Sequence, residues 1–180
     1  MDYTPRLATA LLACAALTPL AALAQDAPAS PPPEAVRRME HVLGRWESTW
    51  EWVDAEGTVV YVEHGTETGR WALEGRLLEL TTEIEGRDGP SKGWMFWNAP
   101  AERFQLVSVG WDGDLWILSG GLEEYVIASE PKAMPDGKTL QIRFTHGEAG
   151  PDTLTAVMEM RGSSEEPWTV RVRQTMVRSS

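Results

Sequence analysis

Cysteine is almost absent from this chain of 180 residues, and the single one, Cys14, lies near the N-terminus. A domain that follows it can form no internal disulfide and cannot use a thiol as a nucleophile or metal ligand. Its stability must therefore come from an apolar core, and the chain is long enough for one domain of that kind.

Positive charge is also scarce, since 16 Lys and Arg stand against 27 Asp and Glu and give a net charge of -11. Nucleic acids and anionic membranes attract proteins through clustered Lys and Arg. We therefore expect no nucleic-acid partner, and we interpret the acidity as a contribution to solubility.

The motifs of the large enzyme classes are missing. The sequence has no P-loop, no dinucleotide-binding fingerprint and no Gly-x-Ser-x-Gly elbow between a strand and a helix. Hydrolysis by paired acids requires one buried carboxyl with a raised pKa, and the pattern offers none. The carboxylates fall mostly on strand faces expected to meet water, namely those of Glu47, Glu51, Glu63, Glu79, Glu83 and Glu159. We therefore expect no cofactor and no metal, and we identify no catalytic residue.

One long apolar run is present, at the N-terminus. Arg6 precedes apolar residues 7–23, and small residues end the run at Ala24. A positive start, an apolar middle and a small-x-small ending predict a secretory signal peptide cleaved after Ala24. The mature protein is then expected to be periplasmic or secreted, with no membrane segment. A retained membrane anchor, or a lipoprotein acylated at Cys14, is the alternative.

The chain accordingly divides into three parts. We expect residues 1–24 to form the signal peptide, residues 25–33 an Ala/Pro linker and residues 34–180 one barrel domain. Residues 34–43 carry an apolar stripe that predicts a short helix, and Gly44 is placed to cap it. So short a helix must pack its stripe on other elements, and we expect it across one end of the barrel.

Tryptophan is abundant, with nine in the chain and none before Trp46. In residues 44–53 a period of two places Trp46, Trp50 and Trp52 on one face, which predicts a half-buried strand. Similar alternation continues through about ten short segments joined by turns, and a sheet of that length tends to close because closure removes its edges. The sequence therefore predicts an all-β, up-and-down antiparallel barrel of about 8–10 strands, with the helix closing one end.

The strongest turn signal is Asp112-Gly113. A two-residue Asp-Gly loop predicts a type I′ hairpin in which Val109 pairs with Trp116. Both faces of residues 104–118 carry apolar side chains, so that the periodicity does not decide which face points inward.

Three segments resemble the lipocalin and calycin group. Gly44-Arg45-Trp46, at the start of the first strand after a short helix, is similar to the Gly-x-Trp opening of lipocalins. Gly75-Arg76-Leu77 and Trp111-Asp112-Gly113 resemble segments of bacterial lipocalin-like families of unknown function. The Thr-Asp-Tyr motif of true lipocalins is missing, as are their disulfides.

The resemblance implies a motif at the closed end of the barrel, in which the first-strand tryptophan packs against an arginine of the last strand. Trp46 is that tryptophan, and Arg178 or Arg173 is its partner. We favour Arg178 because it shares the phase of Gln174, and we assign Gly44, Trp46 and Arg178 to this structural motif.

A barrel of this size has room for one small ligand, and residues on the inward phases are candidates to line it. These candidates are Trp50, Trp52, His64, Phe144, His146, Met158, Trp168 and Gln174. Aromatic and thioether side chains suit an apolar or amphipathic molecule. The first hypothesis is therefore an exported barrel that binds a small hydrophobic ligand.

Two other functions stay open. If His64 and His146 both point inward, they could meet as an acid–base pair or as ligands of a metal or haem. A core histidine with satisfied hydrogen bonds, or one at the rim, is the commoner explanation for each, and His41 is expected at the surface. Alternatively, the aromatic residues fill the barrel, and its outer face binds partners in the cell envelope. The sequence does not indicate the oligomeric state.

Overall fold

The computed structural model of the protein describes residues 31, 33–122, 126–147 and 150–179. The predicted signal peptide, with Cys14 and Ala24, and most of the predicted linker lie outside the described residues. The described residues therefore cover most of the part from residue 34 onward.

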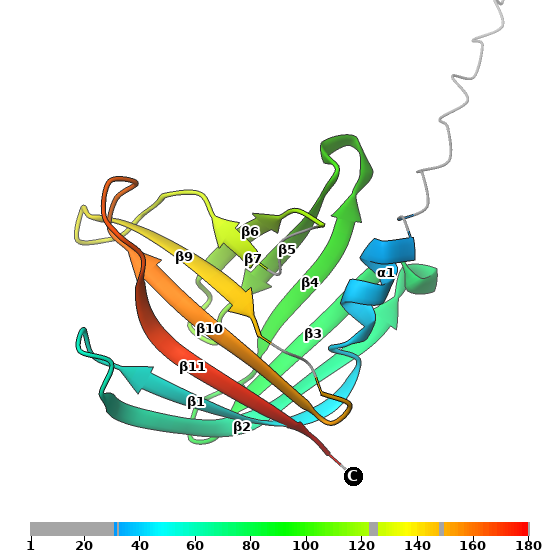
Figure 1. Ribbon diagram of the computed structural model, residues 1–180, viewed down its shortest axis with the longest axis horizontal. Helices are drawn as coiled ribbons and strands as arrows, with labels where there is room; N and C mark the ends of the chain where they lie inside the picture. Colours follow the sequence, from blue (N-terminus) through cyan, green and yellow to red (C-terminus); the bar gives the residue numbers. More distant parts are fainter. Residues whose placement is uncertain (1–30, 32, 123–125, 148–149, 180) are drawn as a thin grey trace, which may run out of the picture.

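Antiparallel strands form one sheet that closes into a barrel (Figure 1). The strands are β1 (Gly44–Val53), β2 (Val59–Ala72), β3 (Leu77–Ile84), β4 (Ser91–Asn98), β5 (Arg103–Val109), β6 (Leu115–Gly120), β7 (Val126–Ser129), β8 (Lys132–Ala133), β9 (Thr139–His146), β10 (Thr153–Arg161) and β11 (Thr169–Arg178). Each strand pairs with its neighbours in the chain except at β8, which pairs only with β9, so that β7 also pairs with β9. Pairing of β11 with β1 completes a wall of ten strands. The predicted all-β up-and-down barrel is confirmed.

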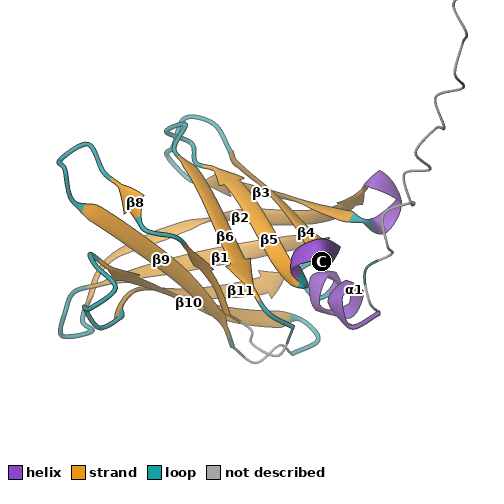
Figure 2. Cartoon of the chain, turned by 90° about the horizontal axis from the view of Figure 1, so that it is seen from above, coloured by secondary structure: helices purple, strands orange, loops and turns teal. Residues whose placement is uncertain are grey.

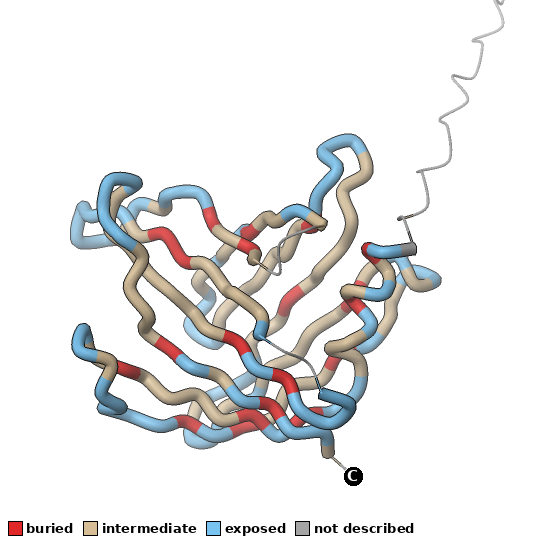
Figure 3. Tube along the Cα trace, in the orientation of Figure 1, coloured by how far each residue is buried: buried red, intermediate tan, exposed pale blue. Residues whose placement is uncertain are grey.

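The strands form because their sequence alternates. In β10, buried Leu154 and Ala156 alternate with exposed Thr153 and Thr155, as expected for a sheet with one dry face. Figure 3 shows exposed positions gathered in the hairpin loops and buried positions spread along the strands. Two short 3-10 turns, η1 (Leu73–Gly75) and η2 (Ala99–Ala101), connect β2 to β3 and β4 to β5.

Helix α1 (Pro33–Glu40) lies at one end of the barrel (Figure 2). Ala35 and Met39 are fully buried and pack in one cluster with Leu78 of β3 and Phe104 of β5. A helix of eight residues is unstable alone, so this packing holds it in place. The expected position of the helix is confirmed.

The helix ends earlier than the sequence predicts. The backbone N–H of Leu43 donates to the Glu40 carbonyl in a turn (3.1 Å), and Gly44 then begins β1 with a φ of 103°. A Cβ at Gly44 would lie 2.7 Å from Nη1 of Arg178. Glycine alone tolerates both this backbone and this close approach, so Gly44 serves the strand rather than the helix.

The prediction that His64 points inward and Glu63 outward on β2 is wrong. Trp52 pairs with Tyr61, but Val53 pairs with Val59, so Val60 is an extra residue in a bulge. Directly opposed residues share a face, and the partner of Trp50 is therefore inside the barrel. That partner is Glu63, which is 5% exposed, whereas Val60 is 64% exposed.

A second bulge reverses the expected face of Trp168. Met158 of β10 pairs with Val172, but the next residue, Glu159, pairs with Val170, so β11 contains one extra residue there. The alternation that holds from Met176 back to Val172 is broken at this point. Trp168 consequently lies outside the cavity, and its ring stacks on two guanidinium groups, those of Arg143 (4.6 Å) and Arg161 (4.3 Å).

The hairpin between β5 and β6 has a three-residue loop instead of the predicted two. Gly110 N–H donates to the Asp114 carbonyl (2.8 Å), and Gly113 has a φ of 82°. This shifts the pairing by one residue, so that Ser108 rather than Val109 lies opposite Trp116. The face that carries Ser108 and Trp116 lines the barrel interior.

Candidate functional site

The barrel interior contains a cavity of about 350 Å³. Its wall is mostly apolar, with aliphatic and thioether side chains from seven strands: Leu80, Met95, Leu106, Leu118, Ile142, Met158 and Met176. Four aromatic residues add to it: Trp46, Trp50, Trp116 and Phe144. This volume falls at the lower end of the range for small-molecule pockets, and the wall has their usual composition.

The cavity continues toward the end of the barrel opposite α1. A second hollow of about 300 Å³ shares Trp50, Phe144, Met158 and Gln174 with the first. It extends to residues of the hairpin between β5 and β6, namely Trp111, Asp112 and Asp114. The shared residues join the two hollows, which gives the interior a route to the hairpin end of the barrel.

The structure brings most of the predicted lining residues together. Trp50, Phe144, His146, Met158 and Gln174 line the cavity, and Trp52 lines the outer hollow. These six residues come from β1, β9, β10 and β11, which are adjacent in the closed wall.

Two predicted residues do not line the cavity. His64 is exposed, and its Nδ1 lies 3.2 Å from the Thr49 hydroxyl on the outer face. Trp168 stacks between arginines outside, as described above. His64 was placed by the apolar phase of Val60 and Val62, which faces solvent in the structure. Trp168 was placed by a period of two that the bulge in β11 interrupts. His64 and His146 therefore lie on opposite faces of the wall and cannot act as a pair on one ligand.

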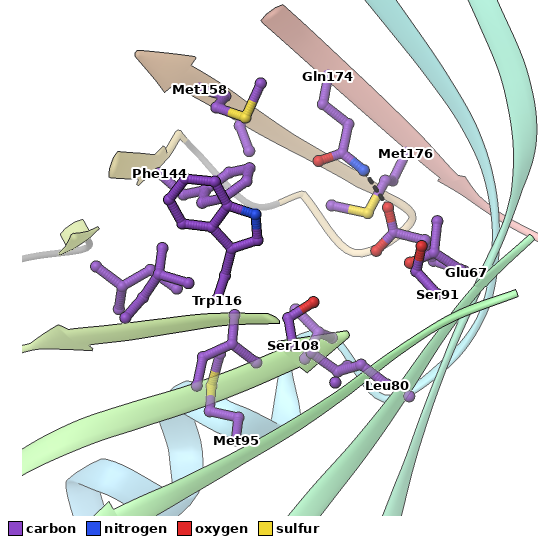
Figure 4. A pocket seen from close by; sticks show the side chains of 18 of the residues that line it. Glu67, Leu80, Ser91, Met95, Ser108, Trp116, Phe144, Met158, Gln174 and Met176 are labelled. Carbon is purple, nitrogen blue, oxygen red and sulfur yellow. Dashed lines mark hydrogen bonds between the residues drawn. The ribbon is translucent and has the colours of Figure 1, made fainter. Parts of the chain in front are cut away.

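The cavity contains a carboxyl group that sequence reasoning missed. Glu67 of β2 pairs with Trp46 and so faces inward, where the Gln174 side-chain amide donates to its Oε1. Figure 4 shows this pair at one side of the cavity, with Trp116, Phe144 and Met158 away from it. Ser48 lies between Trp46 and Trp50 on β1, and this small side chain leaves room for Gln174 to reach across to Glu67.

Burial gives Glu67 an unusual acidity. Removal from water raises the pKa of this carboxyl to about 7, although the neighbouring Gln174 and Ser48 side chains lower it in part. A signal for Glu67 existed in the sequence, because it shares a phase with Gly65 and Gly69, two glycines unusual on a solvent face. Val60 and Val62 hid that signal, because these apolar residues on the solvent face made the opposite face of β2 the expected inward one.

A second inward carboxylate, Glu63, lies nearer the open end and is neutralised. Arg87, from the loop after β3, donates through Nε to Glu63 Oε1 (2.8 Å), and Trp52 Nε1 donates to Oε2 (2.7 Å). The Arg87 guanidinium also lies 4.5 Å from the centre of the Trp111 ring. This group of side chains links three parts of the wall beside the outer hollow.

The opposite end of the cavity, beneath α1, holds two histidines. The His41 and His146 rings are 5.7 Å apart and nearly perpendicular. Burial, and secondarily the charge of His41, lower the pKa of His146 to about 4, and burial also lowers the pKa of His41. Both imidazoles are therefore neutral at pH 7. His41, expected at the surface, instead lines a hollow of about 40 Å³ under the helix with Arg38 and His146.

Trp46 and Arg178 meet at the end of the barrel near α1. The guanidinium lies 4.1 Å from the centre of the indole and donates through Nη1 to the Leu43 carbonyl (3.0 Å). Trp46 Nε1 donates to the Val42 carbonyl (3.2 Å). These contacts connect the first strand, the last strand and the segment that follows the helix.

Among the described residues, no group of three or more His, Cys, Asp or Glu side chains is placed to hold a metal ion, and no helix is long and apolar enough to span a membrane. The segment from Gly89 to Gly93 has the spacing Gly-x-Ser-x-Gly, but Ser91 begins β4 and does not join a strand to a helix. Ser91 lines the cavity without the geometry of a nucleophile elbow.

The fold and cavity define an up-and-down β-barrel with a route into its interior. No family model matches the chain, and no curated protein matches it. The crystal structure of Rv2717c from M. tuberculosis is similar, with a TM-score of 0.57 and 16% identity over 84% of this chain and 100% of that chain. A redesigned beta barrel gives a TM-score of 0.40 and 12% identity over 80% of this chain and 96% of that one. The likeness to Rv2717c shows the barrel fold.

Proposed function

We propose that the protein binds one small apolar or amphipathic molecule inside the barrel. The observation that carries this proposal is the cavity of about 350 Å³, which has an apolar wall and a route to the hairpin end. A wall of this kind stabilises a bound ligand mainly by removing its apolar surface from water.

The cavity also argues against the alternative of a filled barrel. Small residues, namely Gly93, Ser108 and Ala156, line the cavity beside Trp116 and Phe144 and leave space between the large side chains. The packing of Arg178 on Trp46 further supports the resemblance to calycin barrels, many of which enclose a ligand.

Two measurements test binding. Native mass spectrometry of protein purified gently from its own host should show a reproducible extra mass from the bound molecule. Titration with the apolar fluorophore N-phenyl-1-naphthylamine should raise the emission of the dye and change the tryptophan emission, because Trp50 and Trp116 line the cavity. Absence of both an extra mass and a dye response would overturn the proposal.

A filling variant distinguishes the cavity from the outer surface. Ala156→Phe places a ring inside, since Ala156 is 3% exposed and lines the cavity. Thr155→Phe adds the same ring to the exposed outer face of the same strand. We expect Ala156→Phe to abolish dye binding and Thr155→Phe to preserve it, with circular dichroism confirming that both are folded.

We also propose that the protein is exported and processed after Ala24, which follows from the N-terminal sequence pattern. Expression of the full chain in a bacterial host should give periplasmic or secreted protein whose intact mass lacks residues 1–24. A full-length mass would instead indicate a retained anchor, and a lipid-modified mass beginning at Cys14 would indicate a lipoprotein.

A further inference from the structure

We propose that the cavity selects a molecule with a basic nitrogen, held as an ammonium group against Glu67, whose apolar body lies against Trp116, Phe144 and Met158. This inference rests on the proposed function and adds the chemical class of the ligand. It follows from the arrangement of charge and aromatic surface inside the barrel.

Glu67 has capacity for a further partner. A carboxylate offers about four acceptor positions on its two oxygens. Gln174 donates to Oε1, and Ser48 is the other neighbour that stabilises the ionised form. The hydrogen bond from Gln174 leaves acceptor positions on a group that lines the cavity, and an ammonium group with its three N–H donors matches them.

An anionic ligand would find no comparable partner of opposite charge in the cavity. Among the described residues that line it, Lys92 is the one cation, and its ammonium bonds instead to Thr81 (2.7 Å) and Glu79 (3.5 Å), which lie on the outer face. His146 is neutral at pH 7. A ligand carboxylate would therefore lose its water, meet Glu67 and gain no opposite charge, which is strongly unfavourable.

Two other cationic side chains lie near the interior. One is paired with a carboxylate, and the other is separated from the main cavity. Arg87 is bound to Glu63 beside the outer hollow. Arg38 lines the small hollow under the helix, on the far side of His146. Neither lines the main cavity, so the local charge there is set by Glu67.

Aromatic residues complete the match to a cation. Trp46 is directly opposite Glu67 in the sheet, and Trp50, Trp116 and Phe144 also line the cavity. The faces of indole and phenyl rings attract ammonium groups, most strongly where water is excluded. An acidic group among aromatic rings therefore favours an amine over an alcohol of the same length.

The proposal also predicts coupling to protons. Burial raises the pKa of Glu67 to about 7, in spite of the opposing effects of Gln174 and Ser48, and a bound ammonium favours the ionised form. An amine therefore binds well above pH 7, whereas below pH 7 it must first displace a proton from Glu67. Affinity for the amine should fall as the pH is lowered, while affinity for a neutral alcohol should not.

Three probes of equal length test the proposal: decylamine, decanol and decanoate, each measured by displacement of N-phenyl-1-naphthylamine. At pH 8 we expect decylamine to bind about tenfold more tightly than decanol, and decanoate to bind most weakly. Glu67→Gln, which keeps the shape of the side chain, should remove the preference for the amine and leave the affinity for decanol within about threefold. Lowering the pH to 5.5 should weaken decylamine about tenfold in the natural protein and not in this variant.

The matched control is Glu83→Gln, which removes one negative charge from the exposed outer face of β3 and should keep the preference. Equal displacement by all three probes, or a preference unchanged by Glu67→Gln, overturns the amine inference while the binding function stands. Tightest binding of decanoate overturns it too. If the dye does not bind and no probe has an effect, the proposed function itself fails.

Discussion

Two ionisable side chains in one cavity respond to pH in opposite directions. Glu67 is a buried acid whose pKa rises to about 7, and His146 is a buried base whose pKa falls to about 4. In both cases burial disfavours the charged form. An ionised Glu67 at high pH and a protonated His146 at low pH therefore both lower the stability of the folded protein.

The prediction for Glu67 concerns the alkaline side. Between pH 4.5 and about 7 the folded protein holds a proton on Glu67 that the unfolded chain releases, so stability falls as the pH rises. The glutamine in the Glu67→Gln variant is neutral at every pH, so the variant does not lose stability in this way. We expect the variant to gain about 2 kcal/mol in unfolding free energy, relative to the natural protein, between pH 4.5 and pH 8. Urea unfolding at both pH values measures it, and an equal difference at both would contradict the assignment.

The prediction for His146 concerns the acidic side. Between pH 6.5 and about 4, His146 binds a proton in the unfolded chain but not in the folded protein, so stability falls as the pH is lowered. His146→Gln should flatten this decline by about 2 kcal/mol, whatever its effect on stability at pH 7. The exposed His64 provides the comparison: His64→Gln should leave the decline as steep as before.

At the scale of single elements, the local sequence pattern predicts where the strands lie, but it does not always predict which face of a strand points inward. Alternation in β10 and in the first half of β1 predicts which side chains are buried, and the helix is found where its stripe indicates. The bulge near Arg171 adds one residue to β11, which reverses the side chains that precede it in the chain, from Val170 back to Trp168. A bulge is set by pairing with a neighbouring strand, so the sequence of one strand does not reveal it. Trp168 was misplaced for this reason. His64 and Glu67 were misplaced because the apolar residues Val60 and Val62 face solvent.

The start of β1 is the element most sensitive to a small substitution. Gly44→Ala places a Cβ at a φ of 103° and against Arg178, which disturbs the contact of that guanidinium with Trp46. We expect a loss of about 1–3 kcal/mol in unfolding free energy. Gly121→Ala, where a Cβ meets no atom within 4 Å, should change it by less than about 0.5 kcal/mol. Thermal unfolding followed by circular dichroism compares the two.

The contact of the helix with the barrel is a second property of an element that can be measured. Met39 is fully buried between α1 and the strands, so Met39→Ala leaves a cavity and should cost about 2–4 kcal/mol. Exposed Glu40, the next residue, serves as the reference, and Glu40→Ala should cost little. Hydrogen exchange should show faster exchange across the helix in the first variant alone; equal exchange in both would contradict the packing described here.

At the scale of the whole molecule the sheet closes into a barrel, and the sequence predicts this closure. A chain without a disulfide, with short alternating segments, closes its sheet to remove the edges, and pairing of β9 with β10 and of β11 with β1 does so. Six of the eight candidates line the cavity or the outer hollow, because the parts of β1, β9, β10 and β11 that carry them alternate regularly. The charged group in the cavity was not predicted, since it depends on how two strands are aligned.

The pairing of the first strand with the last has a consequence for the order of synthesis. Leu43 and Arg178, which meet through a hydrogen bond, are 135 residues apart in the chain. At ribosomal speeds of 5–20 residues per second, about 7–27 s pass between their synthesis. Throughout that time the indoles of β1 lack the neighbour that covers them, and the ring stays open. The barrel therefore cannot close until its last strand has been synthesised.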